Sequence, residues 1–342
     1  MKHFLRHMPR RLFSTTRKPK SFKIYPADEA DSFAHHRHTT KDIPPTKFTD
    51  NLFVHRLPAF TNWFLPTATN RLNIQYLLAA TQASKSDPLI PIEITTPQGV
   101  EQATLPFTAF LGYLSAPSIH PDSPRLYLAQ HPAPSFLDED VPQPFSGLGF
   151  TLRGEHQSNL SQDPSSLIDT DIIAATRDHE VDIYASSLWL SRSSPATNTP
   201  LHRDPNDNLF VQLAGSKIIR ALPPNIGDAL FRSLALSGRT ASIDPRGRIR
   251  DGLLDPRESR VFDSIIWGWD GGAFKAADIG LEREIVEAID SNMYETTVER
   301  GDGVYIPRGW WHAVRSLVPS DIEEQESGAV TTVVASMNWW FR

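Results

Sequence analysis

A histidine and an aspartate two residues apart, His202 and Asp204, stand in the stretch NTPLHRDPNDNLFVQLAGSKIIR. On an extended strand, residues i and i+2 point to the same face, so both side chains can reach one ion. His312, which ends the run GDGVYIPRGWWH, is the third candidate ligand. Two imidazoles and one carboxylate on one face of an octahedral ion leave positions for a co-substrate and O2, which is typical of non-haem Fe(II) oxygenases. An isolated H-x-D triplet is common by chance, so this interpretation depends on its surroundings.

Nitrogen and oxygen must supply any metal ligands, because the chain has no cysteine; disulfides and cysteine nucleophiles are excluded as well. The 342 residues include 39% hydrophobic and 22% charged side chains, which is typical of a soluble globular protein with a large core. No apolar run reaches the roughly 18 residues that a transmembrane helix needs, so no membrane partner is expected. The 28 prolines favour short helices, many turns and a β-rich fold.

The first 20 residues are basic and contain no acid, which is the composition of a mitochondrial transit peptide. Pro9 limits any amphipathic helix there, and a disordered basic tail or a nuclear localisation cluster is the alternative. We therefore expect a mitochondrial location, with nucleus or cytoplasm as the alternative. Removing these residues changes the formal net charge from −6 to about −13, which argues against non-specific binding of nucleic acid.

Residues 21–50 are polar and rich in His, Pro and Thr, and we expect a linker there. His35, His36 and His38 lie close together in it. Zinc binding is one interpretation of this cluster, but histidines in a polar segment bounded by proline are more often solvated.

An N-terminal α/β region is expected over residues 51–124, followed by the main domain at 125–342. Hydrophobic periodicity predicts its elements. Expected in the α/β region are a strand at 52–60, a helix at 71–82, a strand at 91–97 and a strand followed by a helix over 100–114. Expected in the main domain are strands at 125–130, 182–191, 209–213, 216–223 and 330–341, with helices at 228–236 and 281–290. Gly215 is read as a hairpin or bulge position, and the acidic segment 138–140 as a solvated surface.

This order predicts a mainly β (α+β) fold with a double-stranded β-helix, or jelly-roll (cupin), core. Such a core surrounds a cavity, where ligands from distant strands can meet. Residues 225–300 break the strand pattern and are read as a helical insertion that shapes a substrate entrance. Trp267 and Trp269 within it are expected to pack in the interior rather than to bind a ligand.

Several linked motifs from Arg125 to Arg342 resemble the JmjC-type cupin hydroxylases, which use Fe(II), 2-oxoglutarate and O2, and within them the asparaginyl hydroxylase acting on hypoxia-inducible factor. RLYLAQ, the H-x-D stretch, GDGVYIPRGWWH and the closing N-x-W occur in the expected order. The resemblance implies that His202, Asp204 and His312 hold the iron. It implies contacts to 2-oxoglutarate from five further residues: Tyr127, Thr199, Asn208, Lys217 and Asn338.

The implied residue types suit the co-substrate, because a buried carboxylate needs a cation and hydrogen-bond donors to offset its desolvation. Lys217, with the hydroxyls of Tyr127 and Thr199, would supply them. Each has an alternative: Lys217 as a solvated strand residue, Tyr127 as core packing, and the two asparagines as residues held by local hydrogen bonds.

The leading hypothesis is hydroxylation of a protein side chain. N-methyl-lysine demethylation is a second enzymatic hypothesis, and a metal-binding cupin-like scaffold without turnover is a third. The insertion and everything before Arg125 depart from the asparaginyl hydroxylase pattern, so its substrate is not carried over, and small molecules or tRNA stay open. The sequence does not fix the oligomeric state, although JmjC relatives commonly dimerise through helices that flank the barrel, which leaves a homodimer open.

Overall fold

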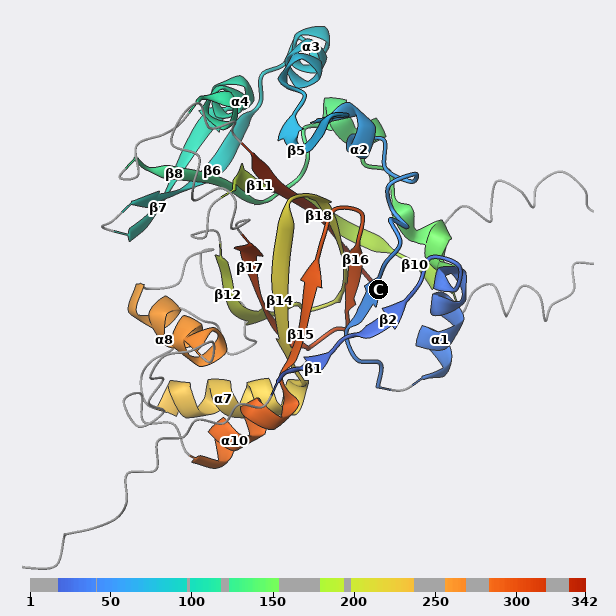
Figure 1. The fold of residues 1–342 in the computed structure, drawn as a ribbon, viewed down its shortest axis with the longest axis vertical. Coiled ribbons are helices and arrows are strands. Elements are labelled where there is room, and N and C mark those ends of the chain that lie inside the picture. Colours follow the sequence, from blue (N-terminus) through green and yellow to red (C-terminus); the bar gives the residue numbers. More distant parts are fainter. Residues whose placement is uncertain are drawn as a thin grey trace, which may run out of the picture.

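Two facing sheets form the body of the protein in the computed structural model (Figure 1). It describes residues 18–40, 42–96, 99–117, 123–153, 179–193, 198–236, 256–268, 283–317 and 332–342. The predicted transit peptide lies outside the described residues up to residue 17, and Trp269 lies outside them too. No helix in the described part of the chain is long and apolar enough to cross a membrane.

The large sheet has nine strands in the order β2-β3-β16-β13-β18-β11-β8-β6-β7. Their bounds are β2 Lys23–Tyr25, β3 Thr46–Phe48, β6 Leu89–Thr96, β7 Gly99–Pro106, β8 Arg125–His131, β11 Ile183–Arg192, β13 Asp207–Ala214, β16 Gly303–Ile306 and β18 Val333–Phe341. The small sheet has five strands in the order β1-β15-β14-β17-β12. Their bounds are β1 Lys20–Ser21, β12 Asn198–Arg203, β14 Ser216–Leu222, β15 Tyr294–Val298 and β17 Trp311–Leu317. The expected mainly β architecture with a jelly-roll core is confirmed.

Alternation along β18 gives the large sheet two different faces, because successive side chains of a strand point to opposite sides. Met337, Trp339 and Phe341 belong to the main apolar cluster on the outer face. Ser336 and Asn338 lie between them and are also buried, on the face turned toward the small sheet. The interior of the barrel is therefore lined in part by polar side chains.

The described segments that precede β11 in the chain cover the outer face of the large sheet. Phe33, Phe48, Phe53 and Trp63 are buried there with Trp339, so the polar linker expected over residues 21–50 is wrong. The helices and 3-10 turns before β11 are η1 Ala30–Ser32, α1 Phe33–Thr39, α2 Ala59–Asn62, α3 Ile74–Ser84, α4 Phe107–Ser115, η2 Ser135–Asp140 and η3 Pro144–Leu148. Two small strand pairs lie in the same part of the chain: β4 Phe64–Leu65 with β5 Ala68–Leu72, and β9 Thr151–Leu152 with β10 Glu180–Val181.

Two expectations for the chain before β11 are corrected by the contacts. Residues 52–58 form turns rather than a strand, and their apolar side chains pack outside any sheet. Asp140 is buried rather than solvated, because it accepts hydrogen bonds from Asn62, Trp63 Nε1 (2.7 Å) and the Tyr76 hydroxyl (2.8 Å). The domain also begins earlier than residue 125, since strands β2, β3, β6 and β7 belong to the large sheet.

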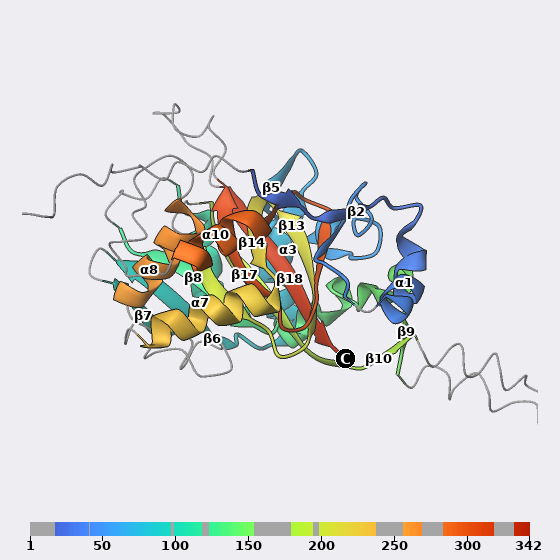
Figure 2. The ribbon, with the colours of Figure 1, turned by 90° about the horizontal axis from the view of Figure 1, so that it is seen from below.

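The insertion between β14 and β15 covers the outer face of the small sheet, where Figure 2 shows its helices side by side. Its described helices are α7 Pro224–Leu236, α8 Pro256–Ile266 and α10 Arg283–Asn292. The helices at 228–236 and 281–290 were expected, whereas α8 was not. Trp267 is buried in the apolar cluster beneath these helices, which confirms packing as its role.

Gly215 turns the chain from the large sheet into the small sheet, so β13 and β14 do not form a hairpin. Its φ of +66° lies in the left-handed region, and an added Cβ would meet Val334 Cγ2 at 3.0 Å. Only glycine fits this corner without strain. The corner places Asn208 of β13 and Lys217 of β14 on two walls of one interior.

Candidate metal and co-substrate site

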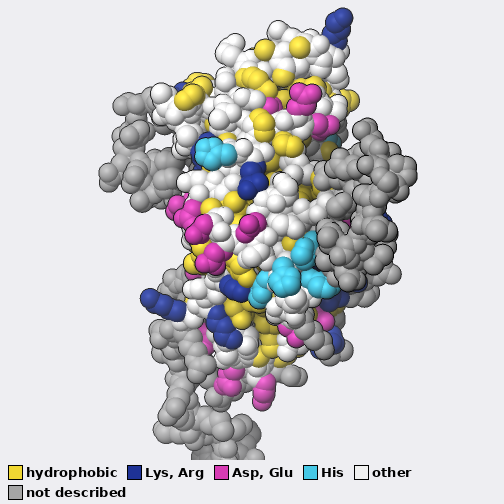
Figure 3. Space-filling model, turned by 90° about the vertical axis from the view of Figure 1, so that its right-hand side faces the viewer, with side chains coloured by type: hydrophobic (Ala, Val, Ile, Leu, Met, Phe, Trp, Pro, Cys, Tyr) yellow, Lys and Arg dark blue, Asp and Glu magenta, His cyan; other side chains and the backbone are white. Residues whose placement is uncertain are grey.

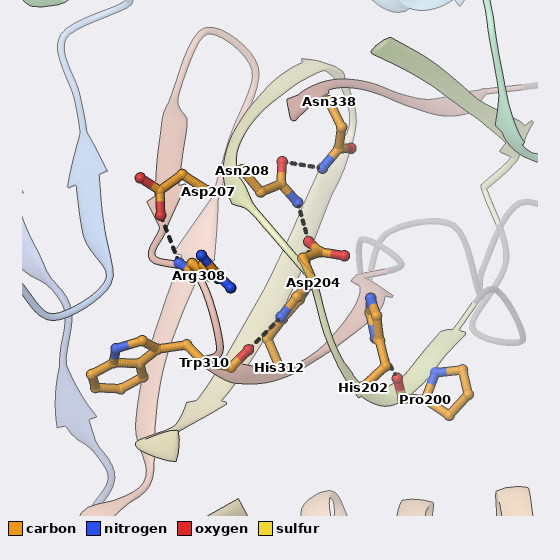
Figure 4. A network of polar contacts seen from close by, with 9 residues as sticks. All are labelled: Pro200, His202, Asp204, Asp207, Asn208, Arg308, Trp310, His312 and Asn338. Carbon is orange, nitrogen blue, oxygen red and sulfur yellow. Dashed lines mark hydrogen bonds and ion pairs between the residues drawn. The ribbon is translucent and has the colours of Figure 1, made fainter. Parts of the chain in front are cut away.

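The three predicted metal ligands meet between β12 and β17, as Figure 4 shows. His202 and His312 are direct partners in the antiparallel register, and their ring centroids lie 4.2 Å apart. Asp204 follows the end of β12, and its Oδ2 lies 3.6 Å from His312 Nε2. One ligand atom from each residue lies within 4.8 Å of the others, a grouping that occurs nowhere else in the described chain.

Backbone carbonyls orient both imidazoles in the same way. His202 Nδ1 lies 2.9 Å from Pro200 O, and His312 Nδ1 lies 3.2 Å from Trp310 O. A carbonyl oxygen only accepts, so each Nδ1 must carry a proton, and Nε2 is the nitrogen of each ring that can bind a metal. Burial, followed by the proximity of His202, lowers the pKa of His312 to about 4, so this ring is neutral at pH 7. Neutral imidazoles in a fixed tautomer are suited to bind a cation.

A chain of amides holds the carboxylate of Asp204. Asn208 Nδ2 donates to Asp204 Oδ2 (2.8 Å), and Asn338 Nδ2 donates to Asn208 Oδ1 (2.8 Å). Both asparagines are buried, so their side chains are set by this network rather than by turns. Behind them, Asp207 accepts from Arg308 N (2.7 Å) and pairs with Arg37 of α1. Asn208 directly, and Asn338 through Asn208, are therefore in position to orient the carboxylate of Asp204 as a metal ligand.

Lys217 is a buried amine with no acid paired to it among the described residues. It is 4% exposed, its Nζ donates to Ser336 Oγ (2.8 Å), and no carboxylate pairs with it in the described part of the chain. Burial lowers its pKa to about 7. A solvated strand residue, the alternative considered above, does not fit this position. An anionic group brought by a ligand would compensate the charge.

Tyr127 and Thr199 lie next to each other in the interior. Their side chains hydrogen-bond to each other, and burial raises the pKa of the tyrosine. Tyr127 of β8 is the register partner of Ser191 on β11, and its ring centroid lies 6.0 Å from that of Trp189. The structure thus brings all of the predicted site residues into one connected interior, while their individual roles stay predictions.

Buried polar atoms without a partner mark space for a polar ligand here. Trp189 Nε1, Ser316 Oγ, Gln212 Oε1 and Asn338 Oδ1 have no hydrogen-bond partner within the described residues. Ser316 is the register partner of Lys217, and Ser336 is that of both Trp189 and Gln212. Buried polar groups are rarely left unpaired. These residues fit a dicarboxylate co-substrate beside a metal held by the triad.

Glu93 is a site residue that the sequence did not single out. It lies on β6 directly opposite Tyr127, so both side chains stand on one face of the sheet. Burial raises the pKa of its carboxyl to about 7, and it has no hydrogen-bond or ion-pair partner among the residues that the structure describes. Its only signal in the sequence is an acid among the apolar residues of PIEITTP. The sequence analysis did not single out Ser336 or Trp189 either, because no motif in the neighbouring sequence marks them.

Comparisons with known proteins agree with this geometry. A model of the cupin-like domain matches residues 45–342. Lysine-specific demethylase JMJ30 of Arabidopsis thaliana is 29% identical over 140 residues, which are 41% of this chain and 25% of that protein. Jumonji C domain-containing protein 5 of Drosophila melanogaster is 29% identical over 141 residues, 41% of this chain and 26% of that protein. The matched part is thus about a quarter of each relative. These relatives support a JmjC resemblance in general and not the asparaginyl hydroxylase in particular.

Proposed function

The chain belongs to the cupin-like domain family, and from that premise we propose that it is an Fe(II)- and 2-oxoglutarate-dependent oxygenase that hydroxylates a protein side chain. The observation that carries the proposal is the pairing of a His-Asp-His group with a buried, uncompensated lysine in one interior. A metal site alone would suit many activities. The lysine adds the need for an anionic co-substrate.

The site residues would have separate roles in binding the metal and the co-substrate. His202, Asp204 and His312 would hold the iron by Nε2 and carboxylate atoms, leaving the remaining positions open. When bound, Fe(II) supplies the redox chemistry that couples decarboxylation of 2-oxoglutarate to succinate and CO2 with oxygen insertion into a C–H bond. Lys217 would bind the distal carboxylate of 2-oxoglutarate, assisted by the hydroxyls of Ser336, Tyr127 and Thr199. The packed strands around these groups would exclude water.

Glu93 supports a basic side chain as the target. A carboxylate that is largely withdrawn from water, next to the expected co-substrate, gains most from a cation brought by the substrate. The indole of Trp189 lies beside Tyr127 on the same wall, where an aromatic face can contact a cation. A lysine or arginine side chain of a protein substrate therefore fits this end of the interior better than a neutral one.

Lysine demethylation is the second candidate, because one relative is named a lysine-specific demethylase. Methyl-lysine is also cationic, and demethylation is hydroxylation of an N-methyl group that then leaves. The two reactions differ in product, since demethylation releases formaldehyde and hydroxylation keeps the added oxygen on the substrate. A metal-binding scaffold without turnover is the non-enzymatic alternative. Mitochondrial location and homodimer formation stay predictions from the sequence.

The test is succinate release by protein loaded with Fe(II) and ascorbate, with 2-oxoglutarate, O2 and a library of peptides that contain Lys, N-methyl-Lys or Arg. Wild type should form succinate and a product 16 Da heavier, as one inserted oxygen atom requires, without formaldehyde. His202→Ala should be inactive, and Lys217→Ala should recover only at high 2-oxoglutarate. Formaldehyde in place of the oxygenated product would assign demethylation. Absence of both turnover and 2-oxoglutarate binding would support the scaffold.

A further inference from the structure

Three histidines from two distant parts of the chain meet on the face of the molecule that carries α1. His35 and His38 belong to α1, and His179 directly precedes β10. The ring centroids of His35 and His179 lie 5.9 Å apart, and those of His38 and His179 lie 6.3 Å apart. Figure 3 shows histidine side chains gathered on this surface. They are far in the fold from the triad between β12 and β17.

Helical geometry and packing hold the three residues near one another. Residues i and i+3 are neighbours on the surface of a helix, so His35 and His38 present their rings on one side of α1. Phe33 anchors the helix in the core against the rings of Phe48, Phe150 and Tyr305. The backbone of His179 is fixed as well, since its carbonyl accepts from Thr151 N (3.0 Å).

The two supporting segments are packed backbone to backbone. Gly149, between η3 and β9, has a φ of +77°, and an added Cβ there would lie 2.0 Å from Asp31 O of η1. That close approach leaves little freedom for α1 to move relative to the β9–β10 pair. The backbone that carries the three histidines is therefore held in place by packing, although the side chains of His35 and His38 are exposed.

We propose that His35, His38 and His179 form a second metal site, which binds Zn²⁺ through three imidazole nitrogens and leaves one position for water. Zn²⁺ accepts nitrogen ligands at about 2.0–2.1 Å in tetrahedral geometry, which places two ligand nitrogens about 3.4 Å apart. The rings now stand edge to face, at interplanar angles of 83° and 71°. The ring centroids, 5.9 and 6.3 Å apart, are those of neighbouring rings, and binding would require the side chains to rotate until one nitrogen of each ring faces the ion.

His36 lies between these ligands in the sequence but is committed elsewhere. Its Nε2 lies 3.0 Å from Lys23 Nζ, and its Nδ1 lies 3.2 Å from the hydroxyl of Thr40. The lysine ammonium beside His36 opposes a second cation there. His36 is therefore the matched control: it has the same residue type on the same helix, but lies outside the proposed site.

A bound ion would fasten α1 to β10, two segments that lie 141 or more residues apart in the chain. The same helix carries Arg37, which pairs with Asp207 at the start of β13, and Asp207 neighbours the Asn208 that holds Asp204. We expect the ion to stabilise the fold, because a ligand that binds only the native state raises its stability. We expect no change in the turnover of 2-oxoglutarate when this ion binds.

Zinc stoichiometry of the full chain, freed of any affinity tag, tests the proposal by equilibrium dialysis and elemental analysis. Wild type should bind two equivalents, one at the iron triad and one at the histidine site. His202→Ala combined with His312→Ala should bind one, and in that background zinc should raise the melting temperature and show imidazole ligation by X-ray absorption. Adding His35→Ala, His38→Ala or His179→Ala should abolish the remaining equivalent, while adding His36→Ala should not.

Two results would overturn the site. One is a triad variant that binds no zinc, and the other is zinc that persists unchanged in the His179→Ala protein. Thermal unfolding of each variant without metal shows whether it folds. The iron-triad and histidine-site variants are separate, so failure of the oxygenase proposal leaves this test intact.

Discussion

The barrel interior contains two regions with opposite chemistry. On one side, the walls formed by β13–β16 and β14–β15 carry an apolar cluster with the buried side chains Phe210, Ile219, Ala221, Val298, Val304 and Ile306. On the other side stand the triad, the two asparagines and Lys217. The boundary runs along single strands: β14 contributes Ile219 to the apolar cluster and Lys217 to the polar region, two residues apart. Lys217 Nζ even lies over the ring of Phe210, 5.4 Å from its centroid.

The two regions separate the side chains that stabilise the fold from those that would bind the ligand. Apolar groups gain free energy when they leave water, so the apolar cluster stabilises the fold by itself. Within the described part of the chain, the polar region contains a lysine that no acid pairs with and buried polar atoms without hydrogen-bond partners, all of which cost stability in the ligand-free protein. Mutations in the two regions should therefore change stability and activity in different proportions.

The largest effect is expected at the triad. His202→Ala or His312→Ala should reduce succinate release to background, because the metal loses a ligand that no neighbour can replace. His131→Ala is a matched control, since His131 is also a strand histidine with its Nδ1 beside a backbone carbonyl (2.8 Å to Pro132 O). Iron content by elemental analysis and turnover should fall together in the triad variants only. Full turnover in His312→Ala would remove that residue from the site.

Lys217→Met should lower the affinity for 2-oxoglutarate but raise the stability of the ligand-free protein. Loss of a buried charge partner costs about 2–5 kcal/mol of binding, so the affinity for 2-oxoglutarate should fall by roughly 30-fold or more. Exchange of this buried amine for an apolar side chain should raise the free energy of unfolding of the ligand-free protein, because burial of a polar or charged group without a compensating acid costs stability. Calorimetric titration and urea unfolding measure the two effects. A variant that loses stability would show that Lys217 supports the fold instead.

Ile219→Ala tests the apolar cluster. Its side chain is fully buried, and truncation of a buried isoleucine to alanine costs about 2–5 kcal/mol. Urea unfolding should show that loss, while 2-oxoglutarate affinity below the unfolding transition should stay within about threefold of wild type. A large loss of affinity with little loss of stability would break the distinction between the two regions.

Glu93→Gln should have the smallest effect, confined to the substrate. Because the pKa of Glu93 is raised to about 7, its carboxyl is neutral below that pH and charged above it. At saturating 2-oxoglutarate, kcat/KM for a basic peptide should rise as pH increases through about 7 in wild type and stay low and flat in Glu93→Gln. Affinity for 2-oxoglutarate should not change. Identical pH profiles of the two proteins would show that Glu93 does not contact the substrate.

Much of this site was predictable because its residues lie in recognisable sequence motifs. His202 and Asp204 are marked by their spacing on an extended strand, the resemblance to JmjC-type hydroxylases implied roles for His312 and Lys217, and the apolar run at 216–223 predicted β14. Glu93 was not predictable, since its position beside Tyr127 depends on the pairing of β6 with β8, which periodicity does not reveal.

Other misses came from contacts between distant segments. Asp140 looked like a surface acid, but three donors from residues 62–76 bury it. The polar composition of residues 21–50 concealed Phe33 and Phe48, which pack on the large sheet. The histidines of α1 meet His179 only in the folded chain. In each case the sequence shows the residue, but it does not show which distant residue its side chain contacts.

The most direct test of the polar region is anaerobic calorimetric titration of 2-oxoglutarate into Fe(II)-loaded protein at several pH values above 7. Burial lowers the pKa of Lys217 to about 7, so binding of the dicarboxylate must restore the proton that the free enzyme has lost. Wild type should bind one equivalent, and its affinity should fall by about tenfold per pH unit above that pKa. Lys217→Met should bind weakly and without this pH dependence. Equal affinity of the two proteins at every pH would contradict the assignment of this interior as the 2-oxoglutarate site.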